Sequence, residues 1–244
     1  MSGLVDITGL KLLVMGGGAG IGLSAVRMAT AAGAEVAVTT MPDETAAEQV
    51  AFHTPCDVTD ASAVSAAVEA AVAALGGIDA AIVTAGIFEH RGVAETSDAD
   101  WARVIAVNLT GPFHVARALE PHFRAAGAGS LVLFSSQVGL VGHRRATAYA
   151  ASKGGINGLT RTLAIEFAAF GARVNAVAPG PVETGMTAVA RADPVRRRAL
   201  LEAVPLGRFG QPDEVACAAL YLAAPASAFV TGHVLVIDGG VTAI

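Results

Sequence analysis

Cysteine and charge are both scarce in this chain of 244 residues. Its two cysteines, Cys56 and Cys217, are too few for a disulfide framework and too isolated for a zinc site, so we expect no metal and a reducing, cytoplasmic setting. Charged residues make up only 15% of the chain, and its net charge of −5 argues against a nucleic-acid partner. The cluster Arg196-Arg197-Arg198 is typical of a solvated helix face.

Long hydrophobic runs are absent as well. Although 53% of the residues are hydrophobic, no uninterrupted apolar segment reaches the roughly 18 residues of a transmembrane helix. The N-terminus lacks the basic region and long apolar stretch of a signal peptide. We therefore expect a soluble protein with no membrane partner, long enough to form one large domain with a substantial core.

Strand and helix patterns alternate along the whole chain, with no linker between them. This alternation predicts an α/β fold with a parallel sheet covered on both faces, in a single domain over residues 1–244. Helices are expected at Ala61–Leu75 and Tyr149–Phe167, and the segment Thr184–Pro205 is expected to be a movable substrate lid. The expected strands are Lys11–Met15, Val36–Thr39, a short one near Val50–His53, Ala80–Thr84, Ser130–Ser135, Arg173–Val177 and Val234–Ile237.

Tyr149 and Lys153 carry the strongest chemical signal. Residues four apart lie on one face of a helix, so the Lys153 ammonium would stand beside the Tyr149 phenol and favour its ionised form. The phenol, with an unperturbed pKa of about 10, could then act as a general acid or base nearer neutral pH. The chain has only two tyrosines and two lysines against fourteen arginines, so a chance match is rare. Ser136 precedes the tyrosine by thirteen residues; a helix-surface pair and a strand-end serine are the alternative interpretation.

A glycine-rich loop, Gly16-Gly17-Gly18-Ala19-Gly20-Ile21-Gly22, follows the first expected strand and precedes a helical pattern from Leu23 to Ala32. Glycines there permit a tight turn, let the backbone approach a pyrophosphate, and present free N–H groups and a helix dipole to it. A glycine loop alone is also compatible with a structural turn. Its position between strand and helix favours a dinucleotide site.

Together these motifs resemble the short-chain dehydrogenase/reductase family in its compact form. The resemblance covers nearly the whole chain and implies a Rossmann-type doubly wound parallel sheet, a nicotinamide cofactor and a secondary alcohol or ketone as the substrate. The residues that carry it are Gly16-x-x-x-Gly20-x-Gly22, Asp57, Ala85-Gly86, Asn108, Ser136, Tyr149, Lys153, Pro179-Gly180 and the closing Asp238-Gly239-Gly240.

The resemblance also implies individual roles. Tyr149 would be the catalytic acid/base, Ser136 would hydrogen-bond the substrate oxygen, and Lys153 would lower the phenol pKa and hold the nicotinamide ribose. Asn108 would keep a water in a proton relay from Lys153, Asp57 would contact the adenine, and Thr184 the carboxamide. Their structural alternatives are a helix-interior asparagine, a turn aspartate and a helix N-cap. The cofactor site would further contain Gly16, Gly18, Gly20, Ile21, Gly22, Thr40, Met41, Val58, Ala85, Gly86, Pro179, Gly180 and Val182.

Two strand ends depart from the family pattern, at three positions. The family usually has threonine where this chain has Met15, and asparagines where it has Val83 and Thr84. Loss of polar groups on two neighbouring strand ends need not leave either one unpaired. The departures nevertheless keep open a non-catalytic nucleotide-binding regulator, against which the intact serine, tyrosine and lysine speak. A lyase or epimerase that uses the cofactor transiently is a third interpretation.

Cofactor choice depends on the end of the second strand, where an acidic residue binds the ribose of NAD and a basic one the 2′-phosphate of NADP. Thr40 and Met41 occupy these positions, and Ala19 stands where NADP enzymes often carry a cation. Asp43 and Glu44 follow closely and would repel a phosphate. These residues favour NAD(H) over NADP(H).

The positions expected to line the substrate pocket are mostly apolar, which favours a ketone or alcohol with an apolar or aromatic body. His143 and Arg144 could add a handle for a polar or anionic group, or could be plain surface residues. A β-ketoacyl thioester is also left open. The substrate positions, placed by comparison with the family, are Phe88, His90, Ser136, Gln137, Val138, His143, Arg144, Met186 and Val189.

Assembly is expected from the resemblance, because family members are commonly tetramers that pair two long helices, here near Asp100–Ala125 and Tyr149–Phe170. The second helix carries Ile156, Leu159, Leu163 and Phe167 at helical spacing. If the core of one domain leaves part of this stripe uncovered, pairing would bury it. We therefore predict a homotetramer; the alternative is that the stripe packs wholly against its own sheet.

Overall fold

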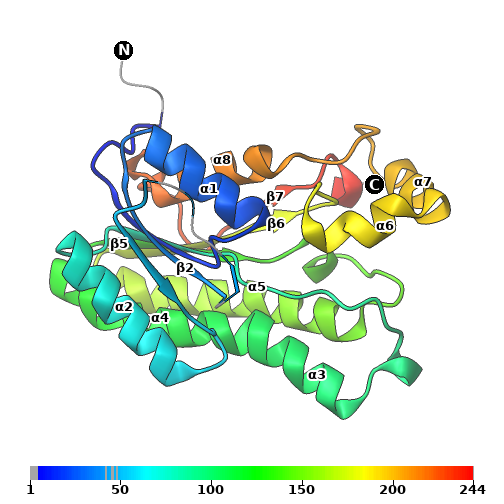
Figure 1. Ribbon diagram of the computed structural model, residues 1–244, viewed down its shortest axis with the longest axis horizontal. Coiled ribbons are helices and arrows are strands. Elements are labelled where there is room, and N and C mark those ends of the chain that lie inside the picture. The colour runs from blue at the N-terminus through cyan, green and yellow to red at the C-terminus, as the bar shows by residue number, and fades with distance from the viewer. Residues whose placement is uncertain (1–4, 42, 45–46, 48, 244) are drawn as a thin grey trace.

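A seven-stranded parallel sheet lies between two layers of helices in the computed structural model (Figure 1), which describes residues 5–41, 43–44, 47 and 49–243. The strand order is β3-β2-β1-β4-β5-β6-β7. Strands β2 and β3 are added on one side of β1 and strands β4 to β7 on the other, so the order of the strands reverses between β1 and β4. Ligands of such sheets bind at the carboxyl ends of the strands near this reversal. The predicted doubly wound, Rossmann-type single domain is confirmed. The strands are β1 Lys11–Met15, β2 Glu35–Thr40, β3 Phe52–Pro55, β4 Ala80–Val83, β5 Gly129–Phe134, β6 Ala172–Pro179 and β7 Val234–Ile237.

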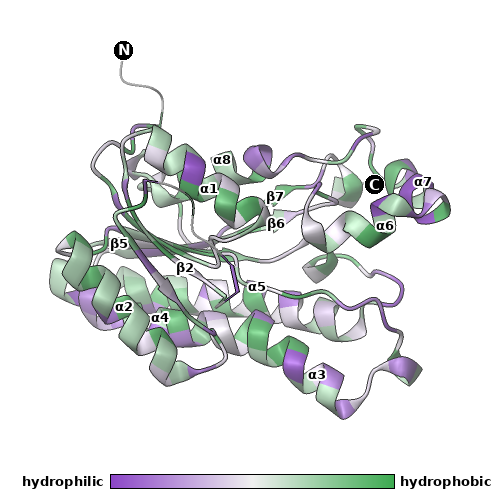
Figure 2. Cartoon of the chain, viewed as in Figure 1, coloured by the Kyte–Doolittle hydropathy of each residue, from purple (hydrophilic) through white to green (hydrophobic). Residues whose placement is uncertain are grey.

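Alternate residues of each strand enter two separate cores, because successive side chains point to opposite faces of a sheet. Leu12 and Val14 of β1 pack with helices α1 (Gly20–Ala31) and α8 (Pro212–Ala223) on one face. Leu13 and Met15 pack on the other face with α2 (Ala61–Leu75), α4 (Gly111–Ala126) and α5 (Thr147–Ala168). All four strand side chains are fully buried, which explains why β1 reads as a continuous apolar run. Figure 2 shows hydrophobic residues along the covering helices and hydrophilic ones gathered on α3 and α7.

The helical segment expected near Asp100–Ala125 is interrupted. It consists of α3 (Asp98–Ile105), one π-helical turn at Ala106–Thr110, and α4. Asn108 lies in the π turn and is fully buried. Such turns widen a helix locally and often occur at functional sites.

Some strands begin or end at other residues than expected, because their bounds depend on hydrogen-bonded pairing with a neighbouring strand. β1 and β7 have the expected bounds, whereas β3 lies two residues later than the expected Val50–His53. Its register is set by parallel pairing with β2, in which Ala37 is opposite Phe52 and Thr40 is opposite Pro55. A four-residue edge strand carries too little periodicity to reveal that register.

The expected lid folds into short helices. A 3₁₀ turn at Gly185–Thr187 leads into α6 (Ala188–Ala192) and α7 (Pro194–Glu202), which lie beyond the carboxyl ends of β6 and β7 (Figure 1). Residues 184–203 are all exposed or half-buried. Whether the segment moves stays a prediction. The remaining 3₁₀ turns are Val93–Glu95, Gln137–Gly139, Pro225–Ser227 and Val241–Ala243.

Among the described helices, none is both long enough and apolar enough to span a membrane.

Candidate active site

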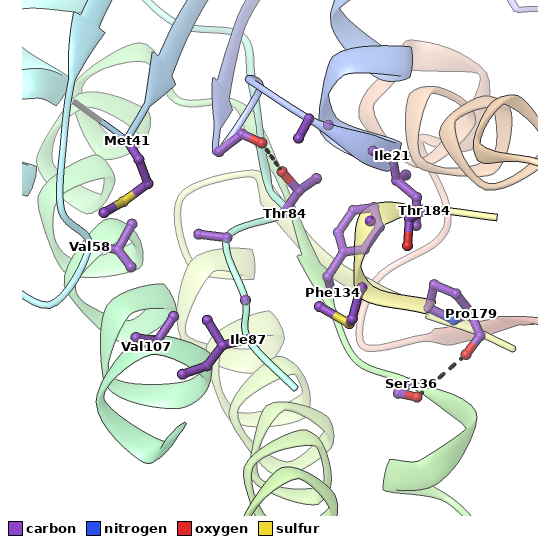
Figure 3. Close-up of a pocket in the computed structure, with 18 of the residues that line it drawn as sticks. Ile21, Met41, Val58, Thr84, Ile87, Val107, Phe134, Ser136, Pro179 and Thr184 are labelled. Carbon is purple, nitrogen blue, oxygen red and sulfur yellow. Dashed lines mark hydrogen bonds between the residues drawn. The ribbon is translucent and has the colours of Figure 1, made fainter. Parts of the chain in front are cut away.

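A cavity of about 590 Å³ lies at the carboxyl ends of the strands. Its walls come from the segments that follow β1, β2, β3, β4, β5 and β6, together with residues of α3 and α5 and the start of the lid (Figure 3). The fold thus brings together residues spread over most of the sequence. Of the expected site residues, the cavity wall includes Gly16, Gly20, Ile21, Gly22, Thr40, Met41, Asp57, Val58, Ala85, Gly86, Ser136, Tyr149, Lys153, Pro179, Gly180, Val182, Thr184 and Met186.

The glycine loop forms a cradle that side chains would fill. Gly16 has a φ of +91°, a conformation that strongly favours glycine. A Cβ on Gly22 would lie 2.3 Å from the Gly16 carbonyl oxygen and 2.5 Å from the Thr84 hydroxyl. Helix α1 begins at Gly20, so its first N–H groups have no acceptor within the helix. This arrangement fits the pyrophosphate of a dinucleotide.

Thr84 anchors the glycine loop, at one of the two places where the chain departs from the family pattern. Its hydroxyl donates to the Gly16 carbonyl oxygen at 2.8 Å and lies 3.1 Å from that of Met15 (Figure 3). The Met15 side chain is fully buried, and its sulfur accepts a weak hydrogen bond from Thr39 at 3.6 Å. The Thr84 hydroxyl therefore has acceptors within the protein, and a hydrogen bond connects the glycine loop to the residue after β4.

Ser136, Tyr149 and Lys153 converge on the cavity from two elements. Ser136 follows β5 by two residues, whereas Tyr149 and Lys153 lie one turn apart on α5. The Lys153 Nζ donates to the Phe134 carbonyl oxygen at 2.7 Å and lies 5.6 Å from the centre of the Tyr149 ring. The Ser136 hydroxyl oxygen accepts from the Val138 N–H at 3.2 Å. A hydroxyl, a phenol and an ammonium therefore face one space.

Burial dominates the protonation of this trio. It raises the pKa of the half-buried Tyr149 phenol above its usual value near 10, and hydrogen bonding with Ser136 acts in the opposite direction with less effect. It also lowers the pKa of Lys153 to about 8. Burial therefore sets the direction of the phenol shift, and the lowering of the phenol pKa by Lys153 stays a prediction. The Tyr149 phenol is therefore neutral at neutral pH.

Asn108 uses its side chain within the protein. Its Oδ1 accepts from the Ile87 N–H at 2.8 Å, and its Nδ2 donates to the Ile87 carbonyl oxygen at 2.9 Å and to the Ser152 hydroxyl at 3.2 Å. The amide thus clamps the segment after β4 against α5. The water relay implied by the family resemblance stays a prediction.

Glu44 covers part of the glycine loop at the opposite end of the cavity. Its Oε2 accepts from the Met41 N–H at 3.2 Å, and a Cβ on Gly18 would lie 2.4 Å from the same oxygen. Gly18 is absent from the cavity wall, and its expected cofactor contact stays a prediction. The Thr40 hydroxyl forms a hydrogen bond with the His53 ring, at 2.8 Å from Nε2.

Asp57 and Thr184 combine cavity positions with local structural contacts. Asp57 Oδ1 accepts from the N–H and the hydroxyl of Thr59, at 2.9 and 2.8 Å, as in a turn aspartate. Thr184 precedes the 3₁₀ turn of the lid, and its N–H donates to the Thr187 hydroxyl at 3.2 Å. The structural interpretation and the cofactor role are therefore compatible at both positions.

Most of the expected substrate residues lie outside the cavity wall. Only Ser136 and Met186 line it. The Phe88 ring packs edge-to-face against the Tyr149 ring at a centroid distance of 4.9 Å. The remaining expected substrate residues also lie outside the cavity wall: His90, Gln137, Val138, His143, Arg144 and Val189. Of these, His143, Arg144 and Val189 are exposed.

Sequence reasoning missed several apolar wall residues. Ile87, Val107 and Phe134 line the cavity, as does Arg103, whose guanidinium pairs with Glu89 and Asp100. Ile87 and Phe134 could have been found, because each lies within two residues of a recognised motif. Among the described residues, no group of three or more histidine, cysteine, aspartate or glutamate side chains could hold a metal ion.

Comparisons with known proteins give consistent matches over nearly the whole chain. A family model described as enoyl-(acyl carrier protein) reductase matches residues 16–242. The chain is 41% identical to galactitol 2-dehydrogenase (L-tagatose-forming) of Cereibacter sphaeroides, over 97% of this chain and 96% of that protein. It is 38% identical to cis-4-hydroxycyclohexanecarboxylate dehydrogenase of Sinomonas cyclohexanicum, over 95% and 96%. A solved structure described as an NAD(P)-dependent gluconate 5-dehydrogenase from Beutenbergia cavernae, with NADP bound at low occupancy, is 32% identical with a TM-score of 0.90, over 98% and 99% of the two chains.

Proposed function

The chain belongs to the short-chain dehydrogenase/reductase family, and we propose here how this nicotinamide-dependent oxidoreductase interconverts a secondary alcohol and its ketone. The observation that carries the proposal is the convergence of Ser136, Tyr149 and Lys153 on one cavity that also contains the glycine cradle. The cradle and α1 would hold the pyrophosphate, and Lys153 the ribose next to the nicotinamide. The bound cofactor supplies or accepts the hydride.

Tyr149 moves the proton. In ketone reduction the neutral phenol donates its proton to the carbonyl oxygen as that oxygen gains negative charge, while the Ser136 hydroxyl hydrogen-bonds the same oxygen. In alcohol oxidation the phenol must first lose its proton to solvent, which burial opposes, and the phenolate then accepts the hydroxyl proton of the alcohol. The Lys153 ammonium, held in place by the Phe134 carbonyl, stabilises the phenolate.

The test is an absorbance assay of the nicotinamide with a panel of secondary alcohols and ketones and with both cofactors. We expect net oxidation or reduction of the nicotinamide that depends on the added substrate. Turnover of a substrate without net change in absorbance would identify a lyase or epimerase. Cofactor binding without turnover of any panel member would favour the nucleotide-binding regulator and contradict the proposal.

NAD is proposed as the preferred cofactor. The charged side chains near Thr40 and Met41 in the described cavity wall are those of Glu44 and Asp57, and a carboxylate would repel a 2′-phosphate. The cations of the described wall are Lys153, beside the phenol, and Arg103, which is already paired with two carboxylates. The test is the ratio of kcat/KM for NAD to that for NADP, which should exceed one.

A homotetramer is proposed on the family resemblance, with one reason corrected. Ile156, Leu163 and Phe167 are buried in the chain's own core, so the stripe on α5 does not need a partner. The outer faces of α4 and α5 instead expose Phe113 (41%) and Ile165 (78%), which pairing could bury. Light scattering of an active preparation at micromolar concentration should give four times the 24.4 kDa chain mass; a monomer would refute the proposal.

The segment 184–205 is proposed as a lid that closes over bound substrate, since its first residues, among them Thr184 and Met186, line the cavity and its helices α6 and α7 have no buried residues. Protection of this segment from proteolysis by cofactor and substrate together would test it.

A cytoplasmic location is proposed because Cys56 and Cys217 are both free thiols; cell fractionation is the measurement.

A further inference from the structure

Two further rings, those of Phe88 and His90, lie next to the Tyr149 phenol. The Phe88 ring contacts the Tyr149 ring edge-to-face, and the His90 ring follows at a centroid distance of 6.3 Å from Phe88. His90 is half-buried and belongs to the segment after β4. A substrate whose reacting carbon meets Tyr149 could therefore extend toward His90.

Arg145 fixes the tautomer of His90. The Arg145 Nε–H donates to His90 Nδ1 at 3.3 Å, so Nδ1 acts as the acceptor and the ring proton is on Nε2. The guanidinium is itself held by both oxygens of the Glu95 carboxylate, with Nη1 at 2.7 Å from Oε1. Within the described part of the chain, no protein group accepts a hydrogen bond from His90 Nε2.

The backbone at Arg145 is strained, an observation independent of the hydrogen bonds. Its φ of +59° places a long side chain in the left-handed region, which only one other non-glycine residue of the described chain, Gln49, shares. Such conformations cost roughly 1–3 kcal/mol and are found where the surroundings enforce them, often at ligand sites. Here the enforced conformation directs the guanidinium at Glu95 and His90.

The surroundings of His90 are electropositive. Burial and the charges of Arg196, Arg145 and His143 lower the pKa of His90, and only Glu95 acts in the opposite direction. Arg196 comes from α7 of the lid, whereas Arg145 and His143 come from the loop before α5. The ring is thus kept neutral, with its Nε2–H as a donor in a region that suits negative charge.

We propose that His90 selects substrates that carry a second oxygen group beyond the reacting carbon, by donating its Nε2–H to that oxygen, and that Arg145 is the residue that positions it. The cationic neighbours favour a carboxylate over a hydroxyl at this place. This inference rests on the proposed oxidoreductase function and adds to it a substrate class. It also explains why Arg145 is held in an unfavourable backbone conformation.

Three cyclic ketones that differ only at C4 test the proposal: 4-oxocyclohexanecarboxylate, 4-hydroxycyclohexanone and cyclohexanone. Their reduction is measured as kcat/KM with NADH and with NADPH. The wild type should prefer the carboxylate over cyclohexanone by about tenfold or more, with the hydroxyl compound between them, because a site built to hydrogen-bond an oxygen discriminates against its absence. Equal kcat/KM for all three ketones would overturn the proposal.

Two variants assign the preference to its residues. His90→Leu should bring the ratio of carboxylate to cyclohexanone close to one. Arg145→Asn removes the guanidinium but tolerates the left-handed backbone, so it should lower the ratio mainly through KM for the carboxylate while the protein melts no earlier than the wild type. A merely structural arginine would instead change stability and leave the ratio intact, which would overturn its positioning role.

The matched control is His122→Leu, at a half-buried histidine of α4 that pairs with Glu69 outside the cavity wall. It should leave both the ratio and the rates unchanged. A preference that survives His90→Leu would overturn the assignment. If none of the three ketones is reduced while other members of the alcohol and ketone panel are, the substrate class is wrong and the proposed function stands; inactivity on the whole panel contradicts the function itself.

Discussion

Replacing Lys153 by methionine should stabilise the cofactor-free protein while it impairs function. The Lys153 side chain is 4% exposed, and burial lowers the pKa of its ammonium from 10.5 to about 8. A lowered lysine pKa means that the folded protein disfavours the charged form, at a cost of roughly 3 kcal/mol at neutral pH. Methionine has a similar unbranched length and no charge to bury.

One interaction offsets part of this gain. The Lys153 Nζ donates to the Phe134 carbonyl oxygen at 2.7 Å, and removing the donor leaves that buried oxygen unpaired at a cost of about 1–3 kcal/mol. The net stabilisation of Lys153→Met at pH 7 should therefore be about 1 kcal/mol. Because the cost of the buried ammonium is complete below pH 8 and disappears as the pH rises toward 10.5, the advantage of methionine should shrink by roughly 1 kcal/mol between pH 7 and pH 9.

Urea unfolding of the two proteins without cofactor, at pH 7 and pH 9 and at equal protein concentration, measures both quantities. The chain offers a matched control, since its only other lysine, Lys11, also donates to a backbone carbonyl, that of Gly76 at 3.0 Å, but at the surface. Lys11→Met should not stabilise the protein, because it removes no buried ammonium. A stability difference between wild type and Lys153→Met that is constant or grows from pH 7 to pH 9 would refute the reasoning. In assays, the same variant should bind the cofactor more weakly and turn over more slowly.

Further predictions concern the phenol, the cofactor and the thiols. Tyr149→Phe should reduce kcat to less than about a tenth of the wild-type value with nearly unchanged cofactor affinity, and a higher residual kcat would remove the tyrosine from its role. Because the phenol pKa is raised, kcat/KM for alcohol oxidation should increase with pH above neutrality; a profile that is flat from pH 7 to pH 9 would contradict this. Met41→Arg should shift the ratio of kcat/KM for NAD to that for NADP toward NADP, as should Glu44→Gln to a smaller extent, and unchanged ratios would place both side chains away from the ribose. A thiol reagent at pH 8 should label the exposed Cys217 quickly, and Cys56, whose pKa burial raises to about 11, only after unfolding; two fast thiols in the native protein would disprove the buried position.

Much of the site could be predicted because its signals are local. The spacing of Tyr149 and Lys153 fixes their shared helix face, and the glycines at Gly16 and Gly22 are required by a φ and a close approach that a single turn imposes. The alternation of apolar segments with helical patterns likewise specifies a parallel sheet. Each of these properties involves residues within a few positions of one another, so the sequence displays them directly.

Other features depend on contacts between distant segments. Burial sets the protonation of Tyr149, and packing places Glu44 over Gly18. The contact between His90 and Arg145 joins residues 55 positions apart.

By itself, the sequence determined the family, the parallel α/β fold and the shared helix face of Tyr149 and Lys153, since these depend on backbone conformation and side-chain spacing along single elements. Only the tertiary structure decided that Asn108 clamps Ile87, that the stripe on α5 faces inward, and that an arginine holds His90 beyond the phenol. Desolvation and pairing energies depend on which groups the folded chain brings within a few ångströms, and no local pattern encodes that distance.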